Sequence, residues 1–469
     1  MLPLVEIPDI VQHYAPFFAS VFSPEAFVQF QRYVSGLIVS ENKTVDGINR
    51  LFVIDVRNQS SLNRWLNESP FSVAALNRCR LELLGSLAGT AIKAKGVLSL
   101  DDTLLTHYGE HFEKIAYLYD SSRGCYVWAH NLVNLHYSDD QTDYPLNFKL
   151  WEPAEAAALE AGLKEAGLPL RESKYALKES APKKWHTYLM GLWRRHQHRP
   201  QVQKLYRSKL LIGEELLSQF FSEHPHLKLP VTFDNWYTQP AFCRFLDKRL
   251  KIPYVGTLAG DERVKAAQGE IPVEELEHHL RHQHHQALYR GDPPLFRKLS
   301  ITYKGQKETY YSYCKTHRIH NFGKQRLVLN HQEADLSDAA TFFISNQLHW
   351  QAGGITRIRR HRWPVEVYHE EGKAEGLDQY QVRDFDAIYR HIALVALTYS
   401  LLRAVSHDKV LLYKLQQSIE TKLGGSAASW CRHTQAQALW SLASFIATAL
   451  SQGQTLSEVM KPLVTAVAY

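Results

Sequence analysis

The spacing of apolar residues predicts helices at both ends of the chain and strands in its centre. Residues 22–39 repeat apolar side chains at helical spacing, and a Ser-Pro pair at their start is a typical cap and first turn. Residues 43–52 and 60–71 also read as short helices, with faces rich in Asn and Arg. We therefore predict a helical domain over residues 1–92. Such short helices suit helix-turn-helix binding to DNA, although helical pairs are also common structural elements.

The centre of the chain has the pattern of strands. Residues 95–105 contain a short apolar run, which is predicted to form a strand that ends at two aspartates. Residues 113–138 read as two β-rich runs joined by a turn at residues 121–124. A strand followed by a hairpin is a coherent three-stranded unit. Further strands are predicted within residues 227–237 and 251–260.

Helices are predicted between and after these strands. Residues 151–180 are rich in Ala, Glu and Lys, residues 212–224 are amphipathic, and residues 386–406 are strongly apolar. Residues 265–345 combine a His-rich helix with several β-like runs, which indicates a β-rich insertion. We therefore expect a helical domain at residues 1–92 and the first part of a core at residues 93–264, which carries a helical and basic insert at residues 150–210. The β-rich insertion at residues 265–345 follows, then the second part of the core at residues 346–405 and a helical region at residues 406–469.

The composition is that of an ordinary globular protein. Of the 469 residues 45% are hydrophobic and 22% are charged, so a chain of this length has several domains or one core with large insertions. The first ten residues contain two acids and no base, unlike a secretory signal, and no apolar run approaches the roughly 18 residues that span a bilayer. Five scattered cysteines without a CxxC pair favour reduced thiols. The sequence therefore predicts a cytoplasmic protein with no membrane partner.

Positive charge is concentrated in one segment. The net charge is only +6, but residues 182–210 hold eight Lys or Arg and no acid, with histidines and aromatic residues between them. Cations mixed with aromatics suit a nucleic-acid backbone and its bases, while a solvated basic helix is the plainer interpretation. The candidate DNA contacts in this segment are Lys183, Lys184, Arg194 and Arg195.

Three carboxylates lie where separate elements are predicted to bring them together. Asp102 and Asp234 each follow an apolar run, and Glu366 falls in the first turn of a helix that begins near Pro364. Carboxylates gathered in this way hold hard cations such as Mg²⁺, and two such ions serve phosphodiester chemistry. A single strand-end Asp is more often a turn cap. Asp101 is the neighbour of Asp102 and points to the opposite face of a strand, so either one is a possible ligand.

Cations surround the third carboxylate. In RIRRHRWPVEVYHEEGK, residues 357–373, Arg362 precedes the predicted helix, and Lys373 shares one helical face with Glu366. An Arg and a Lys beside a metal-ligating Glu would hold phosphate oxygens near the metals. The alternative is a surface helix with Glu-Lys pairs, but this does not explain why the helix begins with Trp363 and Pro364.

The pattern R-x-x-R-W-x-x-E-x-x-x-x-x-x-K is similar to the Y-x2-R-x3-E-x6-K signature of bacterial insertion-sequence transposases of the DDE class. It comprises Arg359, Arg362, Glu366 and Lys373, and it departs from the family at Arg359, where the family has Tyr. LDDT at 100–103 resembles the family's first catalytic Asp followed by Thr, which favours Asp102. FDNWY at 233–237 resembles the second, at Asp234. The likeness covers roughly residues 95–405.

The resemblance implies an α/β, RNase H-like catalytic core, a mixed sheet with helices that carries a β-rich insertion and is flanked by helical regions. It implies a bacterial, nucleoid-associated enzyme in which Asp102, Asp234 and Glu366 are catalytic and bind two Mg²⁺ ions, with Mn²⁺ as a substitute. Arg359, Arg362 and Lys373 would bind DNA phosphates. The substrates implied are the inverted repeats at transposon ends and a target duplex, cut and joined by a homodimer, often through a DNA hairpin.

The insertion suggests a further DNA contact. Asp234 and Glu366 are far apart in sequence, and family members carry a β-rich insertion at this place. Members also resemble one another in flipping a base at the cut end onto an aromatic residue. Trp236 and Trp350 are the candidates for this stacking, although each alone also suits core packing.

The His-rich helix has two interpretations. His278 and His282 stand four residues apart and would suit a transition metal, but no acid or Cys completes a site in the sequence. A solvated or DNA-facing helix is therefore the preferred interpretation.

Two rival functions stay open at the level of sequence. One is an RNase H-like nuclease that cuts DNA without strand transfer. The other is a DNA-binding regulator derived from a transposase and lacking catalysis, against which the complete Asp, Asp, Glu set argues.

Overall fold

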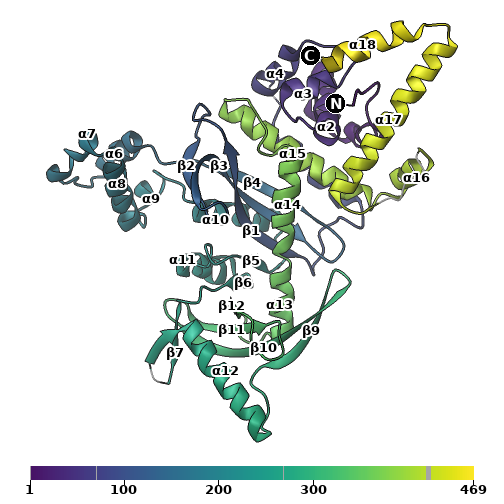
Figure 1. The fold of residues 1–469 in the computed structure, drawn as a ribbon. Coiled ribbons are helices and arrows are strands. Elements are labelled where there is room, and N and C mark those ends of the chain that lie inside the picture. The colour runs from purple at the N-terminus through teal and green to yellow at the C-terminus, as the bar shows by residue number, and fades with distance from the viewer. Residues whose placement is uncertain (1, 70, 268, 419–423, 469) are drawn as a thin grey trace.

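A mixed sheet of twelve strands forms the centre of the protein (Figure 1). The computed structural model describes residues 2–69, 71–267, 269–418 and 424–468. The strands follow the order β2-β3-β1-β5-β6-β12-β11-β10-β7-β8, with β4 paired to β3 and β9 paired to β10. Their bounds are β1 (Val97–His107), β2 (Ala116–Asp120), β3 (Cys125–Ser138), β4 (Asp143–Trp151), β5 (Val231–Phe233), β6 (Tyr254–Thr257), β7 (Arg263–Ala266), β8 (Gly269–Pro272), β9 (Arg297–Tyr303), β10 (Gln306–Ile319), β11 (Gly323–His331) and β12 (Thr341–Ser345).

Strand β1 is the central strand of the core. It pairs antiparallel with β3 over its whole length and parallel with β5, where Leu100 lies opposite Phe233. The side chains of Val97 and Leu98 point to opposite faces of the strand and are both buried, as expected for a strand covered on both faces. β2 and β3 form the predicted hairpin around residues 121–124.

The two aspartates do not end their strand. β1 continues beyond Asp102 to His107, so the expectation that the strand stops at this residue is wrong. Asp is depleted in strands, and a pair of them normally indicates a strand end. Here the ladder to β3 extends past both residues and holds the backbone, with Asp101 opposite Asn134 and Asp102 opposite Val133.

Helices cover the two faces of the core sheet. α10 (Lys209–Glu223) packs on β3 and β4, and Gly213 brings it close to Leu100 because any side chain there would meet that leucine. α14 (Trp363–Ala374) contacts β1, β3 and β4 through the face that carries Asn134. α11 (Pro240–Arg244) and η3 (Phe245–Leu250) connect β5 to β6.

One long helix joins the core to the chain ends. α15 (Phe385–Val405) contacts α14 and three N-terminal helices, α2 (Pro24–Val39), α4 (Gln59–Glu68) and α5 (Val73–Ser86). By length and composition it is apolar enough to cross a membrane, so the expectation that no apolar run approaches that length is wrong. Within this structure 83% of its apolar window is buried, as in the core helix of a folded domain.

Helices from both ends of the chain pack around α15. Ser23 caps the helix predicted within residues 22–39, since its hydroxyl accepts a hydrogen bond from the Ala26 N–H. The helices are α1 (Asp9–Tyr14), η1 (Ala15–Val21), α2 (Pro24–Val39), α3 (Val45–Arg50), α4 (Gln59–Glu68), α5 (Val73–Ser86), α16 (Lys409–Ser418), α17 (Ala427–Ser451) and α18 (Leu456–Ala468). In Figure 1 the chain termini lie on the same side of the molecule, next to α2 and α18.

The segment between β6 and α13 (Ala352–Arg360) combines strands with one long helix, α12 (Val273–Arg290). Its last strand, β12, pairs antiparallel with β6, so the sheet continues from the core into this region. α13 packs on β9 and β6 and leads directly into α14. The chain thus returns to the core sheet at the point where Arg362 and Glu366 occur.

A small helical lobe stands apart from the sheet (Figure 1). It has an apolar cluster of its own, which includes Leu159, Leu163, Trp185 and Leu189. Its helices are α6 (Ala156–Glu165), η2 (Glu172–Lys174), α7 (Leu177–Ser180), α8 (Pro182–His196) and α9 (Pro200–Gln203).

Candidate active site

Three elements bring the predicted Asp234 and Glu366 to the face of β1 that carries Asp101. Asp234 is the first residue after β5, and because Phe233 lies opposite Leu100, Asp234 is level with Asp101 on β1. Glu366 is in the first turn of α14, which packs on β1. Pro364 opens that turn with a φ already suited to a helix. The parallel pairing of β1 with β5 therefore decides that these residues meet.

Arg362 connects two of these carboxylates. Its Nη1 donates a hydrogen bond to Asp101 Oδ2 at 2.6 Å, and its Nη2 donates to Glu366 Oε1. All three side chains are largely buried. A guanidinium presents its donors in a fixed fork, so it holds the two acids in a defined arrangement.

The buried aspartates have perturbed acidity. Burial raises the pKa of Asp101 to about 7; the charge of Arg362 opposes this rise, and those of Asp234 and Asp102 add to it. Burial also raises the pKa of Asp234, while the Tyr237 N–H lowers it by donating to the carboxylate at 3.1 Å. Clustered carboxylates of this kind favour a neighbouring cation.

Asp102 is on the opposite face of β1 and is held by three donors. Its Oδ2 accepts hydrogen bonds from Asn131 Nδ2 at 2.7 Å and from Lys209 Nζ at 2.9 Å. Its Oδ1 accepts one from the Tyr237 hydroxyl at 3.1 Å. Because the Tyr237 N–H binds Asp234, Asp102 supports the loop that positions Asp234.

The carboxylates fit a hard divalent cation by the chemistry of their oxygen atoms. Asp101, Asp234 and Glu366 are the donors that face Arg362 or lie beside it. Within the described ranges, no three His, Cys, Asp or Glu side chains are grouped closely enough to hold a metal ion. The Arg362 guanidinium lies between Asp101 and Glu366 and donates to both acids.

The two other cations of the predicted signature lie on either side of Glu366 in the chain. Arg359 is half-buried on α13, and its Nε donates to Thr257 Oγ1 at 2.8 Å. Burial lowers the pKa of Arg359 to about 9, and the charge of Arg362 adds to this effect. Lys373 is half-buried in the last turn of α14, two helical turns from Glu366.

The two candidate tryptophans lie in different surroundings. Trp236 is 43% exposed, and Lys209 Nζ lies 4.0 Å from its ring centre, so it is coupled to Asp102 through that lysine. Trp350 is partly buried and packs against the apolar cluster of Val255 and Ile355. The structure brings Trp236 next to the carboxylates and places Trp350 against the core.

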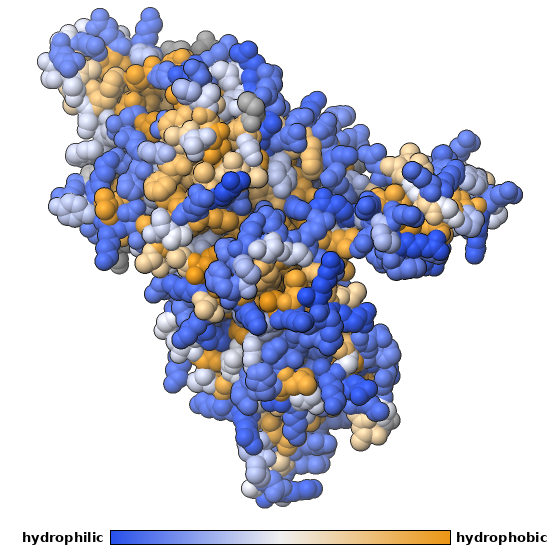
Figure 2. Space-filling view, turned by 180° about the vertical axis from the view of Figure 1, so that it is seen from behind, coloured by the Kyte–Doolittle hydropathy of each residue, from blue (hydrophilic) through white to orange (hydrophobic). Residues whose placement is uncertain are grey.

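The basic residues predicted in the second quarter of the chain lie on the helical lobe. Lys183, Lys184, Arg194 and Arg195 are all exposed on α8, which buries Trp185 and Trp193 on its other side. Figure 2 shows that the lobe is largely hydrophilic on the face it presents, apart from the main body. These cations are separated from the carboxylates and form a surface of their own.

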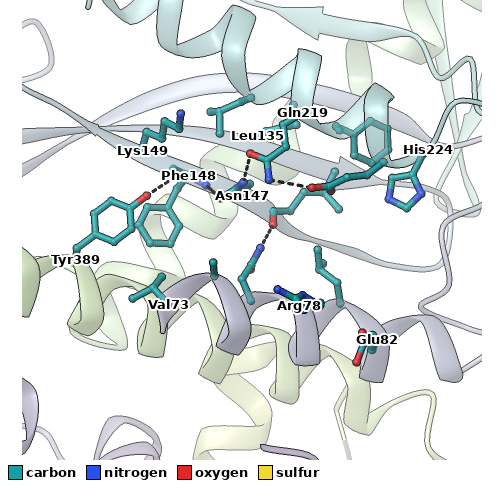
Figure 3. Close-up of a pocket in the computed structure, with 17 residues that line it drawn as sticks. Val73, Arg78, Glu82, Leu135, Asn147, Phe148, Lys149, Gln219, His224 and Tyr389 are labelled. Carbon is teal, nitrogen blue, oxygen red and sulfur yellow. Dashed lines mark hydrogen bonds between the residues drawn. The ribbon is translucent and has the colours of Figure 1, made fainter. Parts of the chain in front are cut away.

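A cavity of about 670 Å³ lies away from the carboxylates, between α5, α10 and β4 (Figure 3). Leu135, Phe148 and Leu216 are among its lining residues, and Arg78 and Glu82 lie at its edge. It contains none of the predicted site residues and takes no part in the site.

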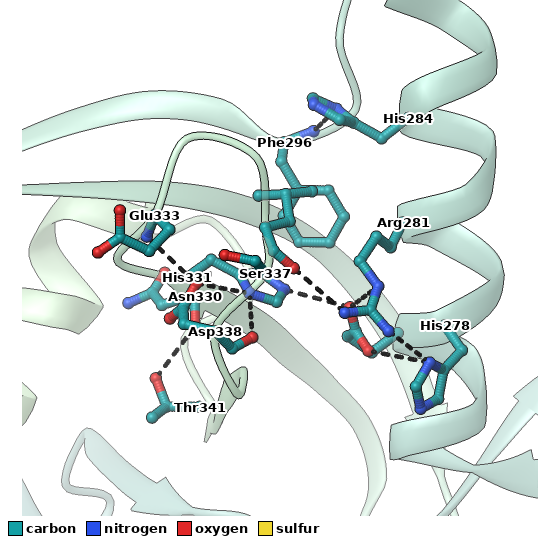
Figure 4. Close-up of polar contacts among 12 residues, drawn as sticks. His278, Arg281, His284, Phe296, Asn330, His331, Glu333, Ser337, Asp338 and Thr341 are labelled. Atoms are coloured by element: carbon teal, nitrogen blue, oxygen red, sulfur yellow. Dashed lines mark hydrogen bonds and ion pairs between the residues drawn. The ribbon is translucent and has the colours of Figure 1, made fainter.

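The His-rich helix is α12, and its histidines have separate partners (Figure 4). His278 accepts from Arg281 Nη2 at 2.7 Å, and His282 lies 2.8 Å from Gln286 Nε2. His284 is buried and accepts from the Phe296 N–H. These contacts favour the structural interpretation of the helix over a metal site on His278 and His282.

Sequence reasoning missed three contributors to the site: Lys209, Tyr237 and Asn131. Lys209 belongs to the basic segment at residues 182–210, and Tyr237 follows the predicted ligand Asp234 by three positions, so each lies beside a feature that the sequence does indicate. Nothing in the sequence indicates that Asn131 meets Asp102, because the contact depends on the pairing of β1 with β3.

Comparison with known proteins agrees with this geometry. A search of curated proteins finds no match. The family described as DDE superfamily endonuclease matches residues 16–309, a region that contains Asp101, Asp102 and Asp234 and stops before Glu366. The predicted fold class is confirmed: a mixed sheet with helices on both sides, consistent with an RNase H-like DDE core. The match spans more than half of the chain, and the protein therefore belongs to the DDE superfamily endonucleases.

Proposed function

We propose that this protein is an insertion-sequence DNA transposase that cuts DNA at transposon ends and joins the freed ends to a target duplex. The observation that carries the proposal is the meeting of Asp101, Asp234 and Glu366 around Arg362. A DDE-family endonuclease acts on DNA through acidic residues of this kind, and here they are brought together from β1, β5 and α14.

The contacts favour Asp101 over Asp102 as the first catalytic acid. Asp101 shares Arg362 with Glu366, whereas the oxygens of Asp102 are already bonded to Asn131, Lys209 and Tyr237. The sequence favoured Asp102 because a Thr follows it. We assign Asp102 to the positioning of Asp234 through Tyr237.

Asp101, Asp234 and Glu366 would hold Mg²⁺, or Mn²⁺ in its place. Two bound ions supply an activated oxygen nucleophile and stabilise the leaving oxygen of a phosphodiester. The chain's own residues position the DNA. Arg362 would contribute its guanidinium to the phosphate, and Lys373 would extend the cationic face of α14. Arg359 stands in the place of the family's Tyr and supports this face from α13.

Other surfaces extend the proposed DNA contact. The exposed cations of α8, which include Lys183 and Arg194, suit the backbone of the transposon end. The N-terminal helices suit a second region of the duplex. Trp236 is the candidate for stacking an unpaired base, because its indole is exposed next to Lys209.

A homodimer that pairs two transposon ends completes the proposal. Its support is the exposed apolar surface of α17 and α18, where Leu439, Trp440, Leu456 and Val464 are all more than half exposed. Such a surface is typical of an interface. We place the protein in the bacterial cytoplasm, associated with the nucleoid.

A cleavage assay with DNA that flanks the gene tests the proposal. The wild-type protein is expected to cut that DNA only with Mg²⁺ or Mn²⁺. Asp234→Asn and Glu366→Gln are each expected to abolish cutting and to leave DNA binding in place. Cutting at the wild-type rate by either variant would refute the site. A strand-transfer assay on the same DNA separates a transposase from a nuclease that only cuts.

A further inference from the structure

The β2–β3 hairpin presents a group of aromatic side chains on one face. Tyr117 lies opposite Trp128, and Tyr119 lies opposite Tyr126, so the four rings form two neighbouring cross-strand pairs. Their ring centres are 5.3 to 5.4 Å apart, and the rings of Tyr117 and Tyr126 are stacked. We call these four residues the aromatic platform. Cross-strand aromatic pairs hold one another in place, so the platform is a fixed surface.

The platform is open to solvent. Tyr117, Tyr119 and Tyr126 are 54%, 56% and 58% exposed. A hollow of about 460 Å³ adjoins it, lined by Tyr108 and Arg123 among others. A folded protein places this much aromatic surface in water at a cost, unless a partner covers it.

The platform lies on the same face of the sheet as Asp101. On β1, His107 is opposite Trp128 and Asp101 is opposite Asn134. Every second residue of a strand points to the same face, so Asp101, His107 and the platform lie on one face of the sheet. Six residues of strand span about 20 Å. Tyr380, which follows α14, packs on His107 with ring centres 4.3 Å apart. The segment that carries Glu366 thus leads to the platform.

Cations accompany this path. Burial raises the pKa of Asp378, and the charges of Lys373 and Arg123 oppose the rise, so both cations lie near that acid. Arg123 is at the hairpin turn, bonded to Asp120 and 59% exposed. Lys114, just before β2, pairs with Glu152 and Glu155 at the start of the helical lobe.

We propose that the aromatic platform binds unpaired DNA bases about 20 Å from the carboxylates, with Arg123 on the adjoining phosphate. The inference rests on the proposed function, because it takes DNA at the carboxylates as given. Aromatic faces stack any base, and a nearby cation neutralises the backbone. A protein strand that paired with the free edge of β2 would use its backbone groups and would not need rings on the face.

Binding of two DNAs to the full chain, measured by fluorescence anisotropy without divalent metal, tests the platform. One is a blunt duplex, and the other carries a single-stranded tail of about ten nucleotides. The wild-type protein is expected to bind the tailed duplex about tenfold more tightly. Tyr117→Ala/Tyr126→Ala is expected to lose that preference and to keep its affinity for the blunt duplex.

Matched variants separate stacking from folding. Tyr117→Phe/Tyr126→Phe keeps both rings and is expected to retain the preference for the tail. Tyr117→Leu/Tyr126→Leu keeps the apolar bulk of the hairpin and is expected to lose it. Tyr289→Ala removes a tyrosine on α12 that is 94% exposed and is expected to change nothing.

The inference is overturned if the wild-type protein binds both duplexes equally, or if the alanine variant keeps the preference for the tail. Loss of self-association in that variant, with tail binding intact, would also overturn it in favour of a protein partner. A wild-type protein that binds neither duplex would refute the proposed function itself. If the wild-type protein binds the blunt duplex but shows no preference for the tailed duplex, only the proposed role of the platform is refuted.

Discussion

Arg362 Nη1 donates a hydrogen bond to Asp101 Oδ2 at 2.6 Å, across 261 positions of sequence. The same guanidinium reaches Glu366, so the cation joins an acid of β1 to an acid of α14. This contact identifies which of two adjacent aspartates faces the third carboxylate. It also places an arginine, a side chain whose planar fork suits phosphate oxygens, against the acids that we propose as metal ligands.

The two adjacent aspartates are expected to differ when each is neutralised. Asp101→Asn removes a proposed metal ligand and should slow DNA cleavage by at least about 1000-fold. Asp102→Asn keeps the size and shape of a side chain that we assign only to positioning, and should slow DNA cleavage by about 10- to 100-fold. Cleavage rates at saturating Mg²⁺ measure both. Equal losses, or a greater loss in Asp102→Asn, would return the first catalytic role to Asp102.

Lys209 is expected to matter for catalysis more than for overall DNA affinity. Lys209→Met removes the hydrogen bond to Asp102 and the cation over Trp236, and cleavage should fall by about 10- to 100-fold. Single-turnover cleavage, with binding measured separately, distinguishes the two effects. Lys228→Ala, at an exposed lysine outside the site, is the control and should cut normally. A Lys209→Met protein with unchanged cleavage would contradict the positioning role.

The cations of α8 are expected to act through the DNA backbone. Lys183→Ala/Arg194→Ala should weaken binding of every duplex alike and reduce the slope of log affinity against log salt by about two, since each lost phosphate contact lowers it by about one. Titrations at several salt concentrations measure the slope. Lys228→Ala/Lys409→Ala removes two other exposed charges and should leave it unchanged. An unchanged slope in the α8 variant would exclude the lobe from the DNA interface.

The segment between β6 and α13 is expected to lose stability as the pH rises. His331 is buried on β11, with Nε2 3.2 Å from Glu277 and Nδ1 3.2 Å from Asp338 (Figure 4). Burial lowers its pKa, but the two acids outweigh this and raise it above the ordinary value. The protonated form is therefore favoured by folding. This contribution to stability is fully present below about pH 6.5 and is lost as the pH rises through the raised pKa.

Denaturant unfolding of the wild-type protein and of His331→Gln, compared at about pH 6 and about pH 8, measures this effect. The wild-type protein should lose more of its free energy of unfolding between the two pH values than the variant does. His282→Gln, at an exposed histidine of α12, is the matched control and should behave as the wild type. Identical pH dependence in the wild type and His331→Gln would rule out His331 as the cause.

Much of the site was predictable because it rests on local patterns. The apolar run before Asp234 and the Pro364 first turn before Glu366 predict where each acid stands in its own element. The strand end assigned to Asp102 was wrong, since the ladder with β3 holds β1 in place beyond it. The residues that support the site were missed because their contacts join separate elements.

The sequence by itself determined the kind of elements and the order of their acids, because hydrophobic period and turn residues act over a few positions. It also determined that Asp101 and Asp102 point to opposite faces of one strand. Only the tertiary structure decided which face receives Arg362 and which receives Lys209. That choice depends on the parallel pairing of β1 with β5 and on the helices that cover each face, and such long-range packing leaves no local trace in the chain.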